Sequence, residues 1–212
     1  MDLAAFRRNY TKGGLRRRDL NADPFVQFET WFKQALEAGI TEPNAFTLAT
    51  ADRFGRPSAR TVLLKYFDAS GFVFYTNYRS RKAREISENP HVAMLFAWLG
   101  LERQVKVTGV AEKVSHADSL KYFMSRPRGS QLGAWVSIQS SVISSRKVLE
   151  MKWAEMMRKF KDRQIPIPDY WGGYRIIPDS IEFWQGGEHR LHDRFLYTKN
   201  EDRQWTIQRL AP

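Results

Sequence analysis

The stretch NAFTLATADRFGRPSARTVLLKYFDASGFVFYTN, from Asn44 to Asn77, carries the pattern that decides the fold. Its apolar residues recur with a period of two, which is typical of β-strands that bury one face. The segments Asp52–Gly55 and Asp68–Gly71 have the composition of turns, and connections this short favour antiparallel hairpins. We therefore expect strands at 45–51, 57–67 and 72–77.

The same period of two continues in later parts of the chain. We expect further strands at 91–97 and 102–114, and strands again from Gly172 to Leu210 with a turn near Asn200–Arg203. Several short strands joined in this way predict a mainly β fold with flanking helices, arranged as a barrel or a sandwich. The sequence contains no GxGxxG or GxxxxGK[ST] motif, which argues against a Rossmann or P-loop nucleotide site.

Two helices are expected to pack against these strands. Asp23-Pro24 is typical of a helix start and Gly39 of a helix end. The first helix is expected to bury Phe25, Phe28, Phe32 and Leu36. A second helix over 145–162 is expected to bury Val148, Leu149, Trp153, Met156 and Phe160.

Composition limits the partners and the compartment. The 212 residues carry a formal net charge of +11 and include no cysteine. The charge suits nucleic acid or small phosphorylated ligands, and the lack of cysteine excludes disulfides and thiol chemistry. The N-terminus lacks a signal-peptide core and no run of about 18 apolar residues occurs. We expect a cytoplasmic protein with no membrane partner, built as a mobile basic arm (1–22) and one domain (23–212).

The segment WQGGEHRLHDR, from Trp184 to Arg194, is the first candidate site. If it is a strand, then Arg190, His192 and Arg194 point to one face. Two guanidinium groups and an imidazole on one face are costly to bury unless an anion or hydrogen-bonding group lies against them. The alternative is a strand face that is simply solvated.

A second candidate site follows the strand at 72–77. Ser80 is expected to begin a short helix, which places Arg81 and Lys82 in the first turn. Cations are unfavourable at that end because the helix dipole is positive there, and a bound anion would remove the conflict. The alternative is that both side chains extend into water. The strand RTVLLK, from Arg60 to Lys65, adds a cation at each of its ends.

A third candidate site lies in the helix that Ser115 is expected to begin. Tyr122 and Arg126 are four residues apart and thus share one helix face, and Ser130 follows after Pro127 and Gly129 end the helix. A phenol, a guanidinium and a hydroxyl together would bind a phosphate. For this pair alone, a packed tyrosine and a solvated arginine are at least as common.

Taken together, these motifs resemble the pyridoxine (pyridoxamine) 5′-phosphate oxidase family. The resemblance covers almost the whole chain and is carried by TKGGLRRRDL, RTVLLK, FYTNYRSRKA, RPRGSQLGAWVSIQSS, FWQGGEHRLHDRFLY and the terminal RLAP. It implies a split β-barrel that works as a homodimer with FMN at the subunit interface. It also implies oxidation of C4′ of pyridoxine or pyridoxamine 5′-phosphate to pyridoxal 5′-phosphate, with hydride transfer to flavin N5 and reduction of O2 to H2O2.

The resemblance also implies roles for individual residues. The implied FMN ligands are Arg60, Thr61, Val62, Leu63, Leu64, Lys65, Tyr75, Thr76, Arg81, Lys82, Gln104, Gln139, Ser140, Trp184 and Arg194. The implied substrate ligands are Lys65, Tyr122, Arg126 and Ser130 at the phosphate, Arg190 and His192 at the pyridine ring, and Arg7 and Tyr10 in a covering segment. Arg190 and His192 are the expected catalytic residues. Which of them assists proton removal is left open, although an arginine is a poor base.

Three other interpretations remain at this point. A nucleic-acid-binding module would account for the net charge and the basic arm, although the family resemblance implies small phosphorylated substrates and no nucleic acid. A split-barrel flavoprotein that reduces a different acceptor would share the FMN motifs. A zinc site at His189 and His192 is weak because the chain has four histidines and no cysteine, and we expect no metal. Arg16, Arg17 and Arg18 have no role in the catalytic account; they either form a separate anion site or are solvated.

Overall fold

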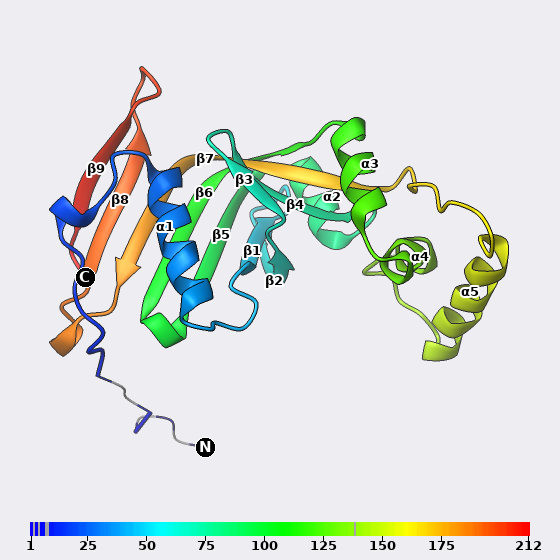
Figure 1. Cartoon of the computed structure of the whole chain (residues 1–212), viewed down its shortest axis with the longest axis horizontal. Coiled ribbons are helices and arrows are strands. Elements are labelled where there is room, and N and C mark those ends of the chain that lie inside the picture. The colour runs from blue at the N-terminus through cyan, green and yellow to red at the C-terminus, as the bar shows by residue number, and fades with distance from the viewer. Residues whose placement is uncertain (2, 4, 7–8, 138) are drawn as a thin grey trace.

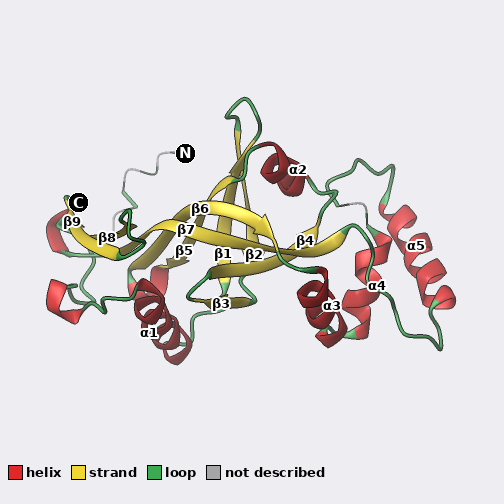
Figure 2. Cartoon of the chain, turned by 90° about the horizontal axis from the view of Figure 1, so that it is seen from above, coloured by secondary structure: helices red, strands yellow, loops and turns green. Residues whose placement is uncertain are grey.

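The fold is a curled β-sheet with flanking helices. The computed structural model describes residues 1–212 apart from 2, 4, 7, 8 and 138, and these form a nine-stranded sheet. The strands are β1 (Ala45–Ala51), β2 (Pro57–Leu63), β3 (Tyr66–Asp68), β4 (Gly71–Asn77), β5 (His91–Trp98), β6 (Arg103–Lys113), β7 (Trp171–Gln185), β8 (Asp193–Lys199) and β9 (Trp205–Leu210). This sheet confirms the mainly β fold, and it has the curvature of a split barrel (Figures 1 and 2).

The long strand β7 organises the sheet. The order is β2-β1-β5-β6-β7-β4-β3, and every pairing is antiparallel. On one edge, β7 pairs with β6 along most of its length. On its other edge, the first half pairs with β4 and the second half pairs with β8, which in turn pairs with β9. Two ends of the molecule are therefore connected through one strand.

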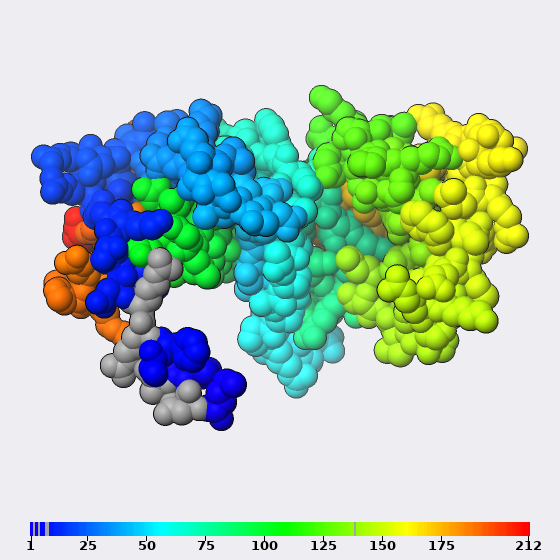
Figure 3. Space-filling model, turned by 60° about the horizontal axis from the view of Figure 1, so that its bottom comes forward, coloured from blue at the N-terminus to red at the C-terminus, as the bar shows by residue number. Residues whose placement is uncertain are grey.

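The helices divide between these two ends. They are α1 (Pro24–Glu37), α2 (Arg81–Glu88), α3 (His116–Ser125), α4 (Arg128–Val136) and α5 (Arg146–Lys159), with short 3-10 turns at Arg17–Asp19, Leu99–Leu101 and Glu188–Arg190. Figure 3 shows the N-terminal residues and the C-terminal strands at one end, and α4 and α5 at the other. Helix α1 packs Phe28 and Trp31 onto the main core, against Phe72, Phe96 and Phe183.

A smaller core holds the helical end together. It contains Phe123 of α3, Leu132 of α4, Met156 of α5 and Trp171 at the start of β7. The expected inner faces of α1 and α5 were each wrong at one residue, since Leu36 is 55% exposed and Trp153 is 40% exposed. Both lie at the margin of their apolar stripes, where the sheet or the neighbouring helix no longer covers the helix.

Three boundaries differ from the expectation. The strand expected at 57–67 is divided, because Leu64 donates to Asn44 and Lys65 donates to Val73, so the chain crosses from β1 to β4 at that point. The break between α3 and α4 is due to Pro127 alone. Gly129 lies inside α4 and does not end a helix.

The segment before β8 is not a strand. Residues Glu188–Arg190 form a 3-10 turn in which His189 and Arg190 have φ of 54° and 64°. The turn folds back so tightly that a Cβ at Gly187 would overlap the carbonyl of Leu191. β8 begins only at Asp193, so the expectation that Arg190, His192 and Arg194 alternate along one strand face was wrong.

Candidate active site

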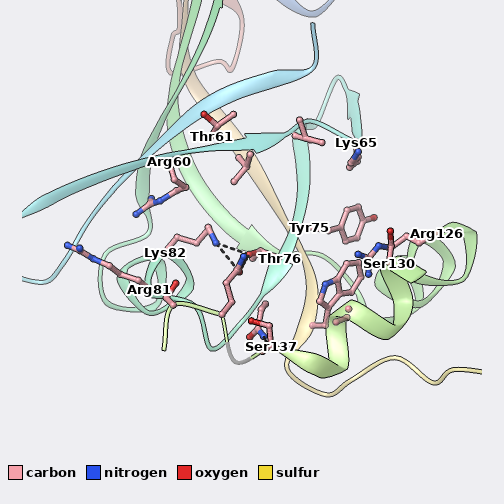
Figure 4. Close-up of a pocket in the computed structure, with 18 of the residues that line it drawn as sticks. Arg60, Thr61, Lys65, Tyr75, Thr76, Arg81, Lys82, Arg126, Ser130 and Ser137 are labelled. Atoms are coloured by element: carbon pink, nitrogen blue, oxygen red, sulfur yellow. Dashed lines mark hydrogen bonds between the residues drawn. The ribbon is translucent and has the colours of Figure 1, made fainter. Parts of the chain in front are cut away.

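A cavity of about 940 Å³ opens between the sheet and the helical end of the molecule (Figure 4). Its lining comes from β2, β4, the start of α2, α3, α4 and the loop after α4. It brings together the expected residues Arg60, Thr61, Val62, Leu63, Lys65, Tyr75, Thr76, Arg81, Lys82, Tyr122, Arg126, Ser130, Gln139 and Ser140. Leu64 is the exception in that stretch, because its side chain turns into the main core and is 5% exposed.

One wall of the cavity carries three cations. Arg60 projects from β2, and Arg81 and Lys82 occupy the first turn of α2, as the sequence predicts. Lys82 is 7% exposed, and within the described part of the chain it forms no ion pair. Its Nζ donates to Thr76 Oγ1 at 3.1 Å and to Gln139 Oε1 at 3.1 Å. Burial, with a further contribution from the charge of Arg60, lowers the pKa of Lys82 to about 8.

Glu85 fixes the two arginines of this wall. Its side chain is 7% exposed, and its Oε1 accepts from Arg81 Nε at 2.8 Å while its Oε2 accepts from Arg60 Nη2 at 3.2 Å. Thr50 and Ser58 also donate to Oε2, each at 2.5 Å. Burial alone would raise the pKa of Glu85, but the hydrogen bonds from Ser58, Thr50, Arg81 and Arg60 lower it to about 2. With Lys82 included, the wall holds three cations and one carboxylate, an excess of positive charge that suits a phosphate dianion.

The opposite wall carries a second set of groups suited to a phosphate. Lys65, Tyr122, Arg126 and Ser130 line it, and Figure 4 shows Lys65, Arg126 and Ser130 on the side away from Lys82. Among the described residues, Nη1 of Arg126 is buried and has no hydrogen-bond partner. A buried guanidinium N–H without an acceptor is costly, so an anionic ligand is the natural partner for this atom. Burial lowers the pKa of Arg126, an effect that the charge of Tyr122 opposes.

The remaining expected residues lie at the other end of β7. Tyr10, Gln104 and Trp184 line a separate cavity of about 180 Å³. His192 stacks near Trp184, with ring centroids 4.7 Å apart, and its Nδ1 accepts from Gly187 N–H at 3.1 Å. Arg194 donates from Nε to the buried Glu182 at 2.7 Å. Arg190 is exposed, and Arg7 lies outside the described residues.

The two groups do not meet within one chain. Tyr75 and Thr76, which line the large cavity, pair with Gly173 and Gly172 near the start of β7. Trp184 lies twelve positions further along the same strand, which is on the order of 40 Å of strand contour. A single copy therefore presents two separate half-sites.

Several residues of this site could not be found from the sequence. Glu85 stands in a charged segment like any solvated helix position, and only the fold shows that it faces Arg60. Trp171 follows a proline-rich link, and its position beneath Arg126 depends on pairing between β4 and β7. Asn77, which donates to the carbonyl of Ser137 at 3.2 Å, connects β4 to the loop after α4. For Asn77 the sequence did hold one signal. It is a hydrogen-bonding residue at the end of a strand, just before a helix that begins with cations.

Other kinds of site find no support in the described residues. No group of three or more His, Asp or Glu side chains there is arranged to hold a metal ion. Nor does any helix in that part of the chain have the length and apolar character needed to cross a membrane.

The fold and the cavity define a class of protein: a split-barrel protein with cationic side chains on two walls of one pocket. Residues 32–159 match the family model described as pyridoxamine 5′-phosphate oxidase. Residues 171–212 match the model described as the pyridoxine 5′-phosphate oxidase C-terminal dimerisation region. The chain belongs to the pyridoxamine 5′-phosphate oxidase family, a family of oxidoreductases.

Individual relatives agree with the family models. The chain is 65% identical to a pyridoxine/pyridoxamine 5′-phosphate oxidase of Rippkaea orientalis over the full length of both chains. It is 58% identical to one of Escherichia fergusonii, covering 99% of this chain and 96% of the other. Among solved structures, PhzG of Burkholderia lata, in complex with tetrahydrophenazine-1-carboxylic acid, superposes with a TM-score of 0.88 at 29% identity, covering 93% of this chain and 98% of the other. An FMN-binding protein of Nostoc punctiforme shares the fold, with a TM-score of 0.70 at 17% identity and coverage of 87% and 97%.

Proposed function

We propose that the chain is an FMN-dependent oxidase that converts pyridoxine 5′-phosphate or pyridoxamine 5′-phosphate to pyridoxal 5′-phosphate. The observation that carries the proposal is the presence of two phosphate-type walls in one cavity of about 940 Å³. FMN and the substrate each carry one phosphate, so two bound phosphates fix both molecules in one pocket. Holding two reactants in one geometry replaces a bimolecular encounter with an oriented step.

The residues of the first wall fit the FMN phosphate. The buried Lys82 lacks a carboxylate partner among the described residues, and Arg60 and Arg81 are held beside it by Glu85. Thr61, Val62, Leu63, Tyr75, Thr76, Gln139 and Ser140 would line the rest of the cofactor site. Bound FMN supplies the redox chemistry, taking two electrons and hydrogen from C4′ of the substrate and delivering them to O2, which becomes H2O2. The positive charge of this wall would favour the reduced, electron-rich form of the flavin over the oxidised form.

The second wall fits the substrate phosphate. Lys65, Arg126 and the hydroxyls of Tyr122 and Ser130 provide the donors, and the unpartnered Nη1 of Arg126 gains an acceptor when the phosphate binds. The alcohol substrate then needs only O2, whereas the amine substrate also consumes water and releases ammonia. Both substrates present the same phosphate to this wall, so it does not choose between them.

Arg190 and His192 are the proposed catalytic residues at the pyridine ring. Because Nδ1 of His192 accepts a hydrogen bond from Gly187, the neutral ring carries its proton on Nε2 and offers a donor to the substrate. Arg190 adds a fixed positive charge. If Arg190→Ala and His192→Ala both kept a near-normal kcat, this assignment to the ring side would be wrong.

The proposed assembly is a homodimer with FMN at the interface. The C-terminal residues match a dimerisation region. Trp184 lies near the end of β7, and Gln104 on β6 and Arg194 on β8 pair with it there, away from the cavity at the start of β7. A second copy would supply them. Residues 23–212 then form one domain. In the segment 1–22, proposed as a flap, Leu15 and Leu20 pack into the main core, so only the part before Leu15 would be able to open. Within it Tyr10 contacts Trp184 and His192, at ring-centroid distances of 5.7 and 5.6 Å. Arg7, which lies outside the described residues, stays a predicted substrate ligand.

A visible spectrum of the purified protein tests the proposal. We expect a flavin band that bleaches when pyridoxine 5′-phosphate is added without oxygen, and that recovers in air as peroxide forms. A band that does not bleach would leave an FMN protein with a different substrate. A colourless protein that takes up no FMN would refute the proposal and return the nucleic-acid interpretation, whose affinity would fall steeply with salt.

A further inference from the structure

Trp171 lies directly against the guanidinium of Arg126. The carbon Cζ of Arg126 is 4.6 Å from the centroid of the indole ring. Trp171 is 8% exposed and lines the cavity beside Arg126. At this distance and burial the cation is attracted to the face of the ring, and tryptophan is the strongest aromatic partner for this interaction.

The indole ring is itself held in a fixed plane. Tyr75 stacks on it with centroids 5.5 Å apart and an interplanar angle of 9°, and Tyr122 stacks on Tyr75 at 4.0 Å. Phe123 meets the indole edge at 5.2 Å. The three stacked rings pack against one another, so the indole ring that contacts Arg126 is held in place by its neighbours.

The backbone of Arg126 is fixed independently of this wall. Pro127 restricts the residue before it to extended φ/ψ, and Arg126 has φ −74° and ψ 147°. The carbonyl of Arg126 accepts from Gln131 Nε2 at 2.9 Å. No carboxylate among the described residues forms a salt bridge with the side chain, and its guanidinium lies over the rings of Phe123 and Trp171 instead.

We propose that Trp171 is a positioning residue for Arg126 and thereby sets the preference of the pocket for phosphorylated substrates. The inference rests on the proposed function. It adds Trp171 to the second wall as a residue that holds Arg126 in place, and Trp171 is not among the predicted substrate ligands. The indole face holds the guanidinium flat, which leaves the buried Nη1 free to face an incoming phosphate. A carboxylate in the same position would pair with Arg126 and compete with the substrate.

The test compares Trp171→Leu, Trp171→Phe and wild type as FMN-loaded enzymes. Leucine removes the aromatic face, so the KM for pyridoxine 5′-phosphate and the inhibition constant of inorganic phosphate should both rise about tenfold. The kcat should stay within about twofold, because the chemistry at C4′ is untouched. Phenylalanine keeps a weaker aromatic face and should limit both increases to about threefold. Inorganic phosphate reports on the second wall alone, because FMN occupies the first.

Trp135 provides the matched control. It packs against the same small core, with its ring 5.6 Å from Phe160, but it does not contact Arg126. Trp135→Leu should lower the melting temperature without raising either constant. If it raised them as much as Trp171→Leu does, general packing would explain the effect and the proposal would be wrong.

Other outcomes also decide the question. The proposal fails if folded, FMN-loaded Trp171→Leu keeps wild-type constants, or if its KM rises while phosphate inhibition is unchanged. If Trp171→Leu does not fold, Trp171→Phe carries the test through its threefold effect. If the wild type oxidises neither substrate, the proposed function fails separately, and calorimetric titration with inorganic phosphate still decides whether Trp171 supports Arg126.

Discussion

Lys82 is a buried cation that forms hydrogen bonds to neutral groups and no ion pair among the described residues, so a bound anion would stabilise its charge. Its pKa of about 8 lies below that of an unfolded lysine, so in the ligand-free protein it loses its proton as pH rises through 8. Between pH 8 and about 10.5 the unfolded chain binds more protons, so stability gains with pH in that window. If Lys82 binds the FMN phosphate as proposed, the charged form is the one that binds, so FMN affinity should fall as pH rises through 8.

We therefore expect FMN affinity to fall by about tenfold between pH 7 and 9. Quenching of flavin fluorescence in titrations at each pH measures it. Lys82→Met should bind FMN weakly at every pH and lose the pH dependence, while Lys121→Met, at an exposed position of α3, should behave as wild type. A wild-type affinity that is flat from pH 7 to 9 would contradict the role given to Lys82.

Glu85 makes the reverse contribution. Its lowered pKa means that its stabilisation is complete above about pH 4.5 and is lost as pH falls toward 2. Glu85→Gln removes the charge from a buried ion-pair network and should lower the free energy of unfolding by about 2 kcal/mol at pH 7. The difference from wild type should narrow as pH falls from 4.5 toward 2, because the unfolded wild-type chain then binds a proton at Glu85 that the folded protein binds only near pH 2.

Urea unfolding at a series of pH values measures this difference. Glu150→Gln is the control, since Glu150 pairs with Arg146 at 3.2 Å on an exposed face of α5. An exposed pair contributes about 0–1 kcal/mol, so this variant should be close to wild type. Equal stability of Glu85→Gln and wild type at pH 7 would show that the network does not stabilise the fold.

Single residues were predictable where local chemistry was in conflict. Arg81 and Lys82 stand at the unfavourable end of a helix, and that conflict predicts either a bound anion or two side chains that extend into water. The structure buries Lys82 and pairs Arg81 with Glu85. Glu85 and Trp171 show no such conflict in the sequence. Their roles come from neighbours 25 and 45 residues away, Arg60 and Arg126, which only the folded sheet brings close.

At the level of elements, the β6–β7 ladder has a bulge between Thr108 and Gly109. A Cβ at Gly109 would overlap the carbonyl of Ile177, so Gly109→Ala should move the two central strands apart and destabilise the protein by about 2–4 kcal/mol. Thermal and urea unfolding measure the loss. At Gly133 in α4 a Cβ would enter open space, with no other atom within 4 Å, so Gly133→Ala should stabilise by about 0.5–1 kcal/mol. If Gly109→Ala and Gly133→Ala changed the stability equally, the close approach of Gly109 to Ile177 would not be the cause of the loss.

Helices and strands were predictable where the local sequence pattern determines them. The predictions were wrong where tertiary contacts determine the boundary of an element. The strands at 45–51, 91–97 and 102–114 agree with β1, β5 and β6 to within one residue at each end. The break at Leu64 and Lys65 was missed, because the apolar run continues while the chain moves from one strand partner to another. The turn at Glu188–Arg190 was missed because left-handed φ at non-glycine residues leaves no mark in the pattern.

At the level of the whole molecule, the motifs were predictable and their separation was not. Sequence order gives no distance, so RTVLLK and FWQGGEHRLHDRFLY read as parts of one site. RTVLLK lines the cavity that also contains Trp171, at the start of β7, whereas the second motif lies at the end of β7, on the order of 40 Å of strand further along. In the proposed homodimer the two copies are related by a two-fold axis, and each copy would give its cavity to one site and its β7–β8 end to the other.

Subunit complementation tests this assembly directly. Lys82→Met disables the cavity, and the double variant Arg190→Ala, His192→Ala disables the β7–β8 end, so each pure dimer should be inactive. A heterodimer has one site with both defects and one site with none. If the two proteins are unfolded together in equal amounts and refolded, random pairing makes half of the dimers mixed, and about a quarter of the wild-type activity should return. If each site were built from one chain, no combination of the two variants would contain an intact site, and mixing would restore nothing.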